Sequence, residues 1–181
     1  CSVLIHGDFL YTSTSNGVGG MQGETFFSKH AYVVRPEAPA IIVLDKHTGQ
    51  LVARERSGIS ARLFHAQWSS PSCGTVGGRT LVFFGGGDGF CYAFEALAAT
   101  GSEPVDLKLV WSYDCNPPEY RSRDGKLFEY YDGDRRKADG HNKNDESYVG
   151  PSEVIATPVF YEGRIYVAIG QDPAHAWHIQ L

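Results

Sequence analysis

The stretch RTLVFFGGGDGFCYAFEA, residues 79–96, decides the fold of this chain, because four glycines separate two apolar runs. A dinucleotide-binding loop requires the pattern G-x-G-x-x-G before a helix. Here Phe90 occupies the third glycine position, and the residues after it alternate as in a strand. The Gly-Lys-Ser/Thr of a phosphate-binding P-loop is also missing. The stretch therefore predicts two antiparallel strands joined by a glycine turn.

Asp88 lies in this turn directly before Gly89, and two roles are open to it. Its carboxylate can cap the turn by accepting backbone N–H groups, or it can act as a ligand on a loop. We expect turn capping, and Asp88 is the first residue to locate in the structure.

The composition favours strands and turns over helices. Among the 181 residues are 21 glycines, 10 tyrosines, 10 phenylalanines and a single methionine, and 42% of the chain is hydrophobic. The net charge is -5 and no basic stripe is present, so we expect no nucleic-acid partner. No apolar run approaches the roughly 18 residues of a membrane span.

A pattern of small residues, apolar strand, turn glycine and apolar strand occurs three times. The copies are CSVLIHGDFLYTSTSNG from residue 1, SSPSCGTVGGRTLVFFGGGDG from residue 69 and ATPVFYEGRIYVAIGQD from residue 156. In the third copy, YEGRIYV predicts a hairpin with a two-residue Glu-Gly centre. Two further strands follow in AIIVLDKHTGQLVAR of the first unit, and in CYAFEALAATG and LKLVWSY of the second. Repeated four-stranded units predict a β-propeller.

The repeats divide the chain into units with two insertions. We expect a blade at 1–54 with a loop insertion at 18–39, a blade at 66–113, a long polar loop at 114–153 and the start of another blade at 154–181. The turn glycines Gly7, Gly78 and Gly163 are 71 and 85 residues apart, whereas a standard blade has about 40–45 residues. The surplus lies in the two insertions, which we expect to be long loops on one face of the disc.

In the first unit, the sequence Asp45-x-x-Thr48-Gly49 predicts a turn. The Asp side chain can accept backbone N–H groups while the glycine adopts the left-handed conformation.

These units resemble the PQQ-like, or quinoprotein-type, propeller repeat, whose hallmark is A-x-D-x-x-T-G-x-x-x-W. Asp45, Thr48 and Gly49 match it, although Val43 and Ala53 replace the Ala and the Trp. In the second unit the match consists of Ala93-Phe94-Glu95, Thr100-Gly101 and Trp111, with two short insertions. FHAQWSSPS, WSYDCNPPEY and VGPSEVIATPVFYEGRIYVAIGQDP are similar to bacterial PQQ-binding-like propeller proteins. The resemblance covers nearly all of the chain, with the possible exception of AHAWHIQL at the end.

The resemblance implies a ring of six to eight blades and a secreted or periplasmic protein. About two and a half units cannot close such a ring, so we expect the remaining blades elsewhere in a longer protein. Two functions follow as expectations. The first is a non-catalytic scaffold in the cell envelope that binds a protein or small-molecule ligand. The alternative is a PQQ-dependent dehydrogenase for alcohols or sugars, with PQQ and calcium in a central funnel.

The sequence identifies no catalytic residue, no cofactor-binding residue and no metal ligand. The adjacent Cys-Cys pair of alcohol-oxidising quinoproteins is absent, and so is a G-x-S-x-G nucleophile motif. The acidic loop DGDRRKADGHNKNDE, residues 132–146, lacks EF-hand spacing, so we interpret it as a solvated loop rather than a calcium site.

Single histidines and tryptophans give weaker signals. His65 could line the funnel, but a hydrogen-bonded structural role is the expectation. Trp68 and Trp111 are expected to pack between blades. The other histidines considered, His141, His175 and His178, lack ligand-like spacing.

Four cysteines are present, and none belongs to a CxxC motif. We expect small buried side chains in strands, although an oxidising compartment would allow three disulfide pairings. The cysteines are Cys1, Cys73, Cys91 and Cys115.

Overall fold

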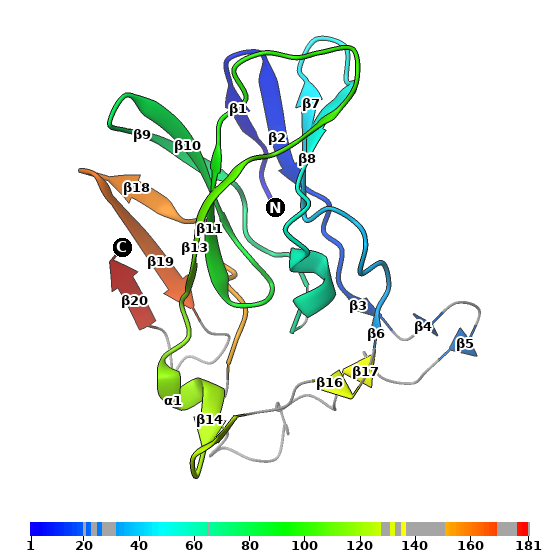
Figure 1. Cartoon of the computed structure of the whole chain (residues 1–181), viewed down its shortest axis with the longest axis vertical. Helices are drawn as coiled ribbons and strands as arrows, with labels where there is room; N and C mark the ends of the chain where they lie inside the picture. Colours follow the sequence, from blue (N-terminus) through cyan, green and yellow to red (C-terminus); the bar gives the residue numbers. More distant parts are fainter. Residues whose placement is uncertain are drawn as a thin grey trace.

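The protein is an all-β molecule built from antiparallel sheets (Figure 1). The computed structural model describes residues 1–19, 21–22, 25–26, 32–64, 66–127, 131–132, 135–136, 151–169 and 177–180. Helical turns in these ranges are limited to the 3₁₀ turn Ile59–Arg62 and the one-turn helix α1, Pro118–Arg121. None of the described helices is long and apolar enough to cross a membrane.

The first sheet contains the four strands expected of the first unit, in the order β1-β2-β7-β8, and a fifth strand, β12. The turn between β7 and β8 confirms the predicted Asp-x-x-Thr-Gly geometry. Oδ1 of Asp45 accepts the backbone N–H groups of His47 and Thr48 over 2.9 and 2.8 Å, and Gly49 has a φ of 73°. The five strands are Leu4–His6, Phe9–Ser13, Ile41–Asp45, Leu51–Arg54 and Val105–Asp106.

The second sheet has four antiparallel strands in the order β13-β11-β10-β9. The predicted glycine hairpin is confirmed, since Gly85 of β10 pairs with Cys91 of β11 and the N–H of Gly86 bonds to the carbonyl of Phe90 over 2.7 Å. Gly89 has a φ of 82°, which favours glycine. The strands are Ser72–Val76 (β9), Arg79–Gly85 (β10), Phe90–Glu95 (β11) and Leu109–Asp114 (β13).

The third sheet joins β18 (Val159–Tyr161), β19 (Arg164–Ile169) and β20 (Trp177–Gln180). Its Glu-Gly hairpin is also as predicted: Glu162 and Gly163 have φ values of 47° and 75°. Positive φ at both central residues is the type I′ pattern of two-residue hairpins.

The central strands β10 and β11 are buried on both faces, and this explains their unbroken apolar runs. Val82 and Phe84 of β10 pack in the core shared with the first sheet. Leu81 and Phe83 point the other way, into a second core shared with Ile165 and its neighbours on β19. Side chains that alternate along β10 therefore pack against two different sheets.

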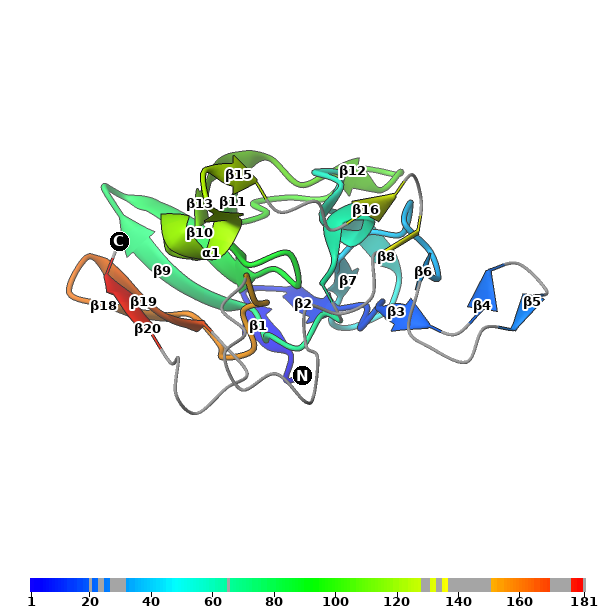
Figure 2. The ribbon, with the colours of Figure 1, turned by 90° about the horizontal axis from the view of Figure 1, so that it is seen from below.

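The three sheets follow one another in space in the same order as in the sequence (Figures 1 and 2). Their first strands lie next to each other, because β1 contacts β9 and β9 contacts β18.

The strand β12 differs from the expected division of the chain. Residues 66–113 were expected to form one unit, but Val105 and Asp106 pair in parallel with Ala53 and Arg54 of β8. The connection between β11 and β13 thus crosses to the first sheet and returns (Figure 1). Burial of the next residue, Leu107, in the first core explains the excursion.

The two insertions carry only short elements in their described parts. Residues 18–39 include the pairs β3–β6 and β4–β5, and β6 lies beside β17 of the second insertion. The structure refines the two ends of the polar loop expected at 114–153. Asp114 still belongs to β13, and residues 151–154 are buried beneath the glycine turn. The short strands are Val18–Gly19 (β3), Met21–Gln22 (β4), Thr25–Phe26 (β5), Tyr32–Val33 (β6), Ser122–Arg123 (β14), Lys126–Leu127 (β15), Tyr131–Asp132 (β16) and Arg135–Arg136 (β17).

Candidate functional site

The glycine turn between β10 and β11 is enclosed by two segments that are distant in sequence, the segment of Phe64 and Gln67 and the segment of Val154. Gly87 donates its N–H to Oε1 of the buried Gln67 over 2.9 Å and accepts the N–H of Phe64 over 2.8 Å. The N–H of Val154 bonds to the carbonyl of Gly86 over 3.1 Å. A Cβ atom on Gly87 would lie 2.3 Å from the carbonyl oxygen of Ala66. The glycines therefore permit a close approach of backbones as well as the turn itself.

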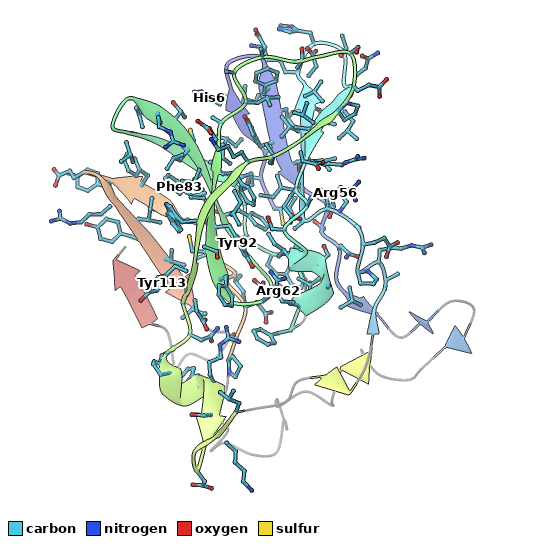
Figure 3. All side chains as sticks on the ribbon, viewed as in Figure 1. His6, Arg56, Arg62, Phe83, Tyr92 and Tyr113 are labelled. Carbon is cyan, nitrogen blue, oxygen red and sulfur yellow. The ribbon has the colours of Figure 1, made fainter. Side chains whose placement is uncertain are left out.

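Asp88 is buried in this turn, with only 2% of its surface exposed. Its Oδ1 caps the turn by accepting the N–H of Phe90 over 3.3 Å, as expected. Its Oδ2 accepts the hydroxyl of Tyr92 over 2.5 Å and Nε of Arg62 over 3.3 Å. A terminal nitrogen of Arg62 also donates to the Tyr92 hydroxyl over 3.0 Å. We call these three residues the Asp88 cluster; Figure 3 shows Arg62 and Tyr92 facing one another.

The protonation of the Asp88 cluster is governed by its burial. Burial raises the pKa of Asp88, although the bonds from Tyr92 and Arg62 oppose that rise. Burial also raises the pKa of the Tyr92 phenol, and the adjacent carboxylate raises it further. The Tyr92 hydroxyl therefore keeps its proton and remains a hydrogen-bond donor. The third member of the cluster, Arg62, has half of its side chain exposed to solvent.

A second ion pair lies beside the cluster. Arg121 of α1 binds Asp114 through two nitrogens, at 2.8 and 2.6 Å, in a bidentate arrangement. Its guanidinium carbon lies 5.4 Å from the ring centres of both Phe64 and Phe90. This arginine joins the second insertion to the turn, and a terminal nitrogen reaches the carbonyl of Asp88 over 3.4 Å.

The arrangement of the Asp88 cluster is that of a structural clamp. Both carboxylate oxygens of Asp88 are engaged by partners inside the protein, and the residue is buried. A general base must reach the proton that it abstracts from a substrate. The geometry therefore favours a role in holding the turn against the segment that contains Arg62.

An open, apolar groove of about 410 Å³ lies between the second and third sheets. Trp111 and Tyr113 of β13 form part of one wall, and Phe160 and Ile165 belong to the opposite sheet. Figure 3 shows Phe83 and Tyr113 on the side of the second sheet that faces the third. We call this feature the inter-sheet groove; its lining comprises Val76, Leu81, Phe83, Trp111, Ser112, Tyr113, Phe160, Gly163 and Ile165.

The two expected tryptophan anchors behave differently. Trp111 packs between sheets as predicted, with its ring centre 6.1 Å from that of Phe83. Trp68 is 47% exposed, and its packing between blades stays a prediction. It lies in the extended connection before β9, outside both cores.

The histidine predictions and the acidic loop fall largely outside the described residues. His65, His141 and His175 are not described, and only the backbone pairing of His178 with Ala168 is. Residues 132–146 are described only at 132, 135 and 136.

In the second unit, Glu95 takes the place of the hallmark aspartate but acts differently. It forms ion pairs with Lys108 at 2.9 Å and Arg79 at 3.3 Å. The hydrogen bond from Lys108 lowers the pKa of Glu95. The resemblance at this position is therefore one of sequence and not of turn geometry.

The described side chains do not fit PQQ with calcium. Within the described ranges, no three His, Cys, Asp or Glu side chains are grouped so that they could hold a metal ion. The two arginines beside the turn are already bound by carboxylates, Arg62 by Asp88 and Arg121 by Asp114. We therefore derive no chemical step through this cofactor.

The comparisons with known proteins add no family. No protein-family model matches the chain, and no curated protein matches it significantly.

Sequence reasoning identified Asp88 but missed its partners and the groove. Arg62 lies 26 residues before Asp88 in the sequence, in a segment without a motif. The sequence did indicate that Tyr92 needs a buried hydrogen-bond partner. Its side chain points to the same face of β11 as Phe90 and Phe94, and it carries a hydroxyl group into an apolar region. The groove depends on the packing of two sheets, for which no local pattern exists.

Proposed function

We propose that the three sheets are blades of a β-propeller of the PQQ-like repeat type, and that the chain is a non-catalytic scaffold that binds another molecule. Three consecutive sheets with adjacent first strands support the architecture. The resemblance of the turn motifs supports the repeat type. A secreted or periplasmic location and a place in the cell envelope rest on that resemblance alone.

The inter-sheet groove carries the binding proposal. It is open to solvent and lined mainly by aromatic and aliphatic side chains. Tyr113 keeps 47% of its surface exposed there, whereas Phe83 at the base is 1% exposed. A rigid base with exposed aromatic edges suits a neutral, apolar group, such as an aromatic or aliphatic side chain of a protein partner or a small apolar ligand.

Catalysis is the second candidate, and the site geometry favours it less. The carboxylate of the buried Asp88 is already bound, its Oδ1 by the N–H of Phe90 and its Oδ2 by Tyr92 and Arg62.

The groove can be tested through the fluorescence of Trp111. The variants Trp68→Phe and Trp177→Phe leave Trp111 as the sole tryptophan of the chain. Titration with the neutral peptide acetyl-Leu-Phe-Leu-amide should shift its emission saturably. Tyr113→Ser should weaken binding by about 5–10-fold through loss of an exposed aromatic contact.

Leu127→Ser is the matched control, because Leu127 is 78% exposed on β15 and does not line the groove. A peptide affinity that Tyr113→Ser leaves unchanged would refute the groove as the binding site. A saturable shift on addition of PQQ with calcium, in place of the peptide, would favour the dehydrogenase alternative.

A further inference from the structure

Two cysteines lie on one face of the second sheet, next to each other. Cys91 of β11 pairs with Tyr113 of β13, and the N–H of Cys115 bonds to the carbonyl of Gly89 over 3.0 Å. Because side chains alternate along a strand, Cys91 and Cys115 point to the same face. Both are fully buried in the core between the second and third sheets.

The sulfur of Cys115 extends back over the pair Cys91–Tyr113. Its Sγ lies 3.7 Å from the carbonyl oxygen of Tyr113, the residue directly opposite Cys91. The backbone N–H of Cys91 also reaches this sulfur, which opposes the rise of the Cys115 pKa to about 12 that burial causes. The two thiols are therefore diagonal neighbours on adjacent strands.

Both residues are free thiols in the structure, and a disulfide between them requires a small shift of the backbone. Diagonal neighbours on an antiparallel pair have Cα atoms about 7–8 Å apart with their Cβ atoms closer, and a disulfide takes Cα distances up to about 6.8 Å. Cys115 follows the last residue of β13, so the shift alters no residue of that strand but strains the bond from the Cys115 N–H to Gly89.

The other two cysteines lie elsewhere. Cys73 of β9 packs against the core on the opposite face of the second sheet. Cys1 is exposed, with its thiol near the carbonyl oxygens of Gln67 and Trp68. The sheet itself separates Cys73 from the pair of buried thiols.

We propose that Cys91 and Cys115 are the two residues that form a disulfide when this chain folds under oxidising conditions, and that this bond fastens the end of β13 to β11. A low-molecular-weight disulfide such as oxidised glutathione is the oxidant. One cysteine thiolate displaces a glutathione thiol to form a mixed disulfide, and the second displaces the other. Two protein thiols are oxidised, one glutathione disulfide is reduced to two thiols, and no other reactant is needed.

Burial determines the stage of folding at which the two thiols can exchange with glutathione disulfide. Both thiols are inaccessible in the folded chain, and burial raises the pKa of each, so the native thiols react slowly. The bond therefore forms during folding or after local opening at the end of β13. The inference does not depend on the proposed binding function.

The test is to refold the reduced, full chain in a glutathione redox buffer, alkylate the free thiols and map the cysteines by mass spectrometry without reduction. We expect one peptide pair joined through Cys91 and Cys115, with Cys1 and Cys73 alkylated. Reduction should then lower the melting temperature by about 5–10 °C. Alkylation of both Cys91 and Cys115, or a bond from either of them to Cys1 or Cys73, would overturn the proposal.

Single substitutions provide the matched control. Cys73→Ser should retain the joined peptides and the reduction-sensitive melting temperature, whereas Cys115→Ser should lose both. Because the mapping of the unsubstituted chain already decides the question, a variant that fails to fold does not prevent the test.

Discussion

The hydroxyl of Tyr92 lies 2.5 Å from Oδ2 of Asp88, and both residues are 2% exposed. Each satisfies a buried polar group of the other, which would otherwise cost free energy in the apolar interior. Arg62 reaches both from the 3₁₀ turn Ile59–Arg62. The pair thus adds a side-chain connection between the glycine turn and the segment that also bonds to Gly87 through Phe64 and Gln67.

We expect Asp88→Ala to lower the free energy of unfolding by about 3 kcal/mol, because it leaves the buried Tyr92 hydroxyl and the inner side of Arg62 without their acceptor. Urea denaturation followed by circular dichroism measures the change. Asp8→Ala is the control: Asp8 also forms an ion pair, but its side chain is 70% exposed, so stability should be nearly unchanged. Equal effects of the two substitutions would contradict the clamp role of Asp88.

The raised pKa of Asp88 has a consequence for the pH dependence of stability. The folded state holds this proton more tightly than the unfolded chain, whose aspartate titrates near about 3.9. The contribution of Asp88 is therefore fully present below that pH and is lost as the pH rises through the folded pKa. The difference in unfolding free energy between the natural chain and Asp88→Asn should fall between pH 4 and pH 7. A difference that grows with pH would show that the pull of Arg62 exceeds the cost of burial.

Gly87 lies where the backbone of the glycine turn closely approaches the backbone of Ala66. A Cβ there would meet the backbone oxygen of Ala66 at 2.3 Å, so we expect Gly87→Ala to destabilise the fold by about 2 kcal/mol or more. Gly101→Ala is the matched control for Gly87→Ala, because a Cβ at Gly101 would meet nothing within 4 Å and the φ of Gly101 is not positive. It should be neutral or slightly stabilising. Thermal melts of both variants make the comparison, and a neutral Gly87→Ala would show that the contact with residue 66 is not tight.

The strands and hairpins could be predicted because their determinants are local. The Glu162-Gly163 centre and the Asp45 turn each require side chains or φ values that few residues supply, so the sequence indicates them directly. The apolar runs around the glycine turn were also sufficient to predict two neighbouring strands, since a strand buried on both faces has no polar alternation.

The parallel strand β12 and the clamp could not be predicted in this way. Val105 and Asp106 are exposed and carry no strand signal of their own. They pair with β8 because the next residue, Leu107, is buried in the core. Similarly, nothing near Arg62 marks it as a partner of Asp88, because only the folded chain brings the two together. Long-range packing decides both features, and a local pattern contains no information about it.

Asp45 should show the opposite pH dependence to Asp88. The backbone N–H groups of Thr48 and His47 lower its pKa, so its contribution to stability is present above about pH 4 and is lost as the pH falls through the folded value. Asp45→Ala should therefore be destabilising at pH 7 and much less so at pH 2.5. Urea denaturation at both pH values measures this. A pH-independent effect of Asp45→Ala would contradict the role of its charge.

The connection through β12 provides the last prediction. Leu107 is 7% exposed, and its N–H bonds to the carbonyl of Arg54 over 2.8 Å. We expect Leu107→Ala to cost about 2–3 kcal/mol, whereas Val105→Ala, at a residue 41% exposed, should cost less than about 1 kcal/mol. Because the parallel pair is short and peripheral, it should open before the second sheet does. In Leu107→Ala, hydrogen exchange should accelerate relative to the natural chain. The acceleration should be larger at the amide of residue 107 than at the amide of Ala93, in the middle of β11. Equal acceleration at both amides would mean that the crossing segment and the second sheet unfold as one cooperative unit.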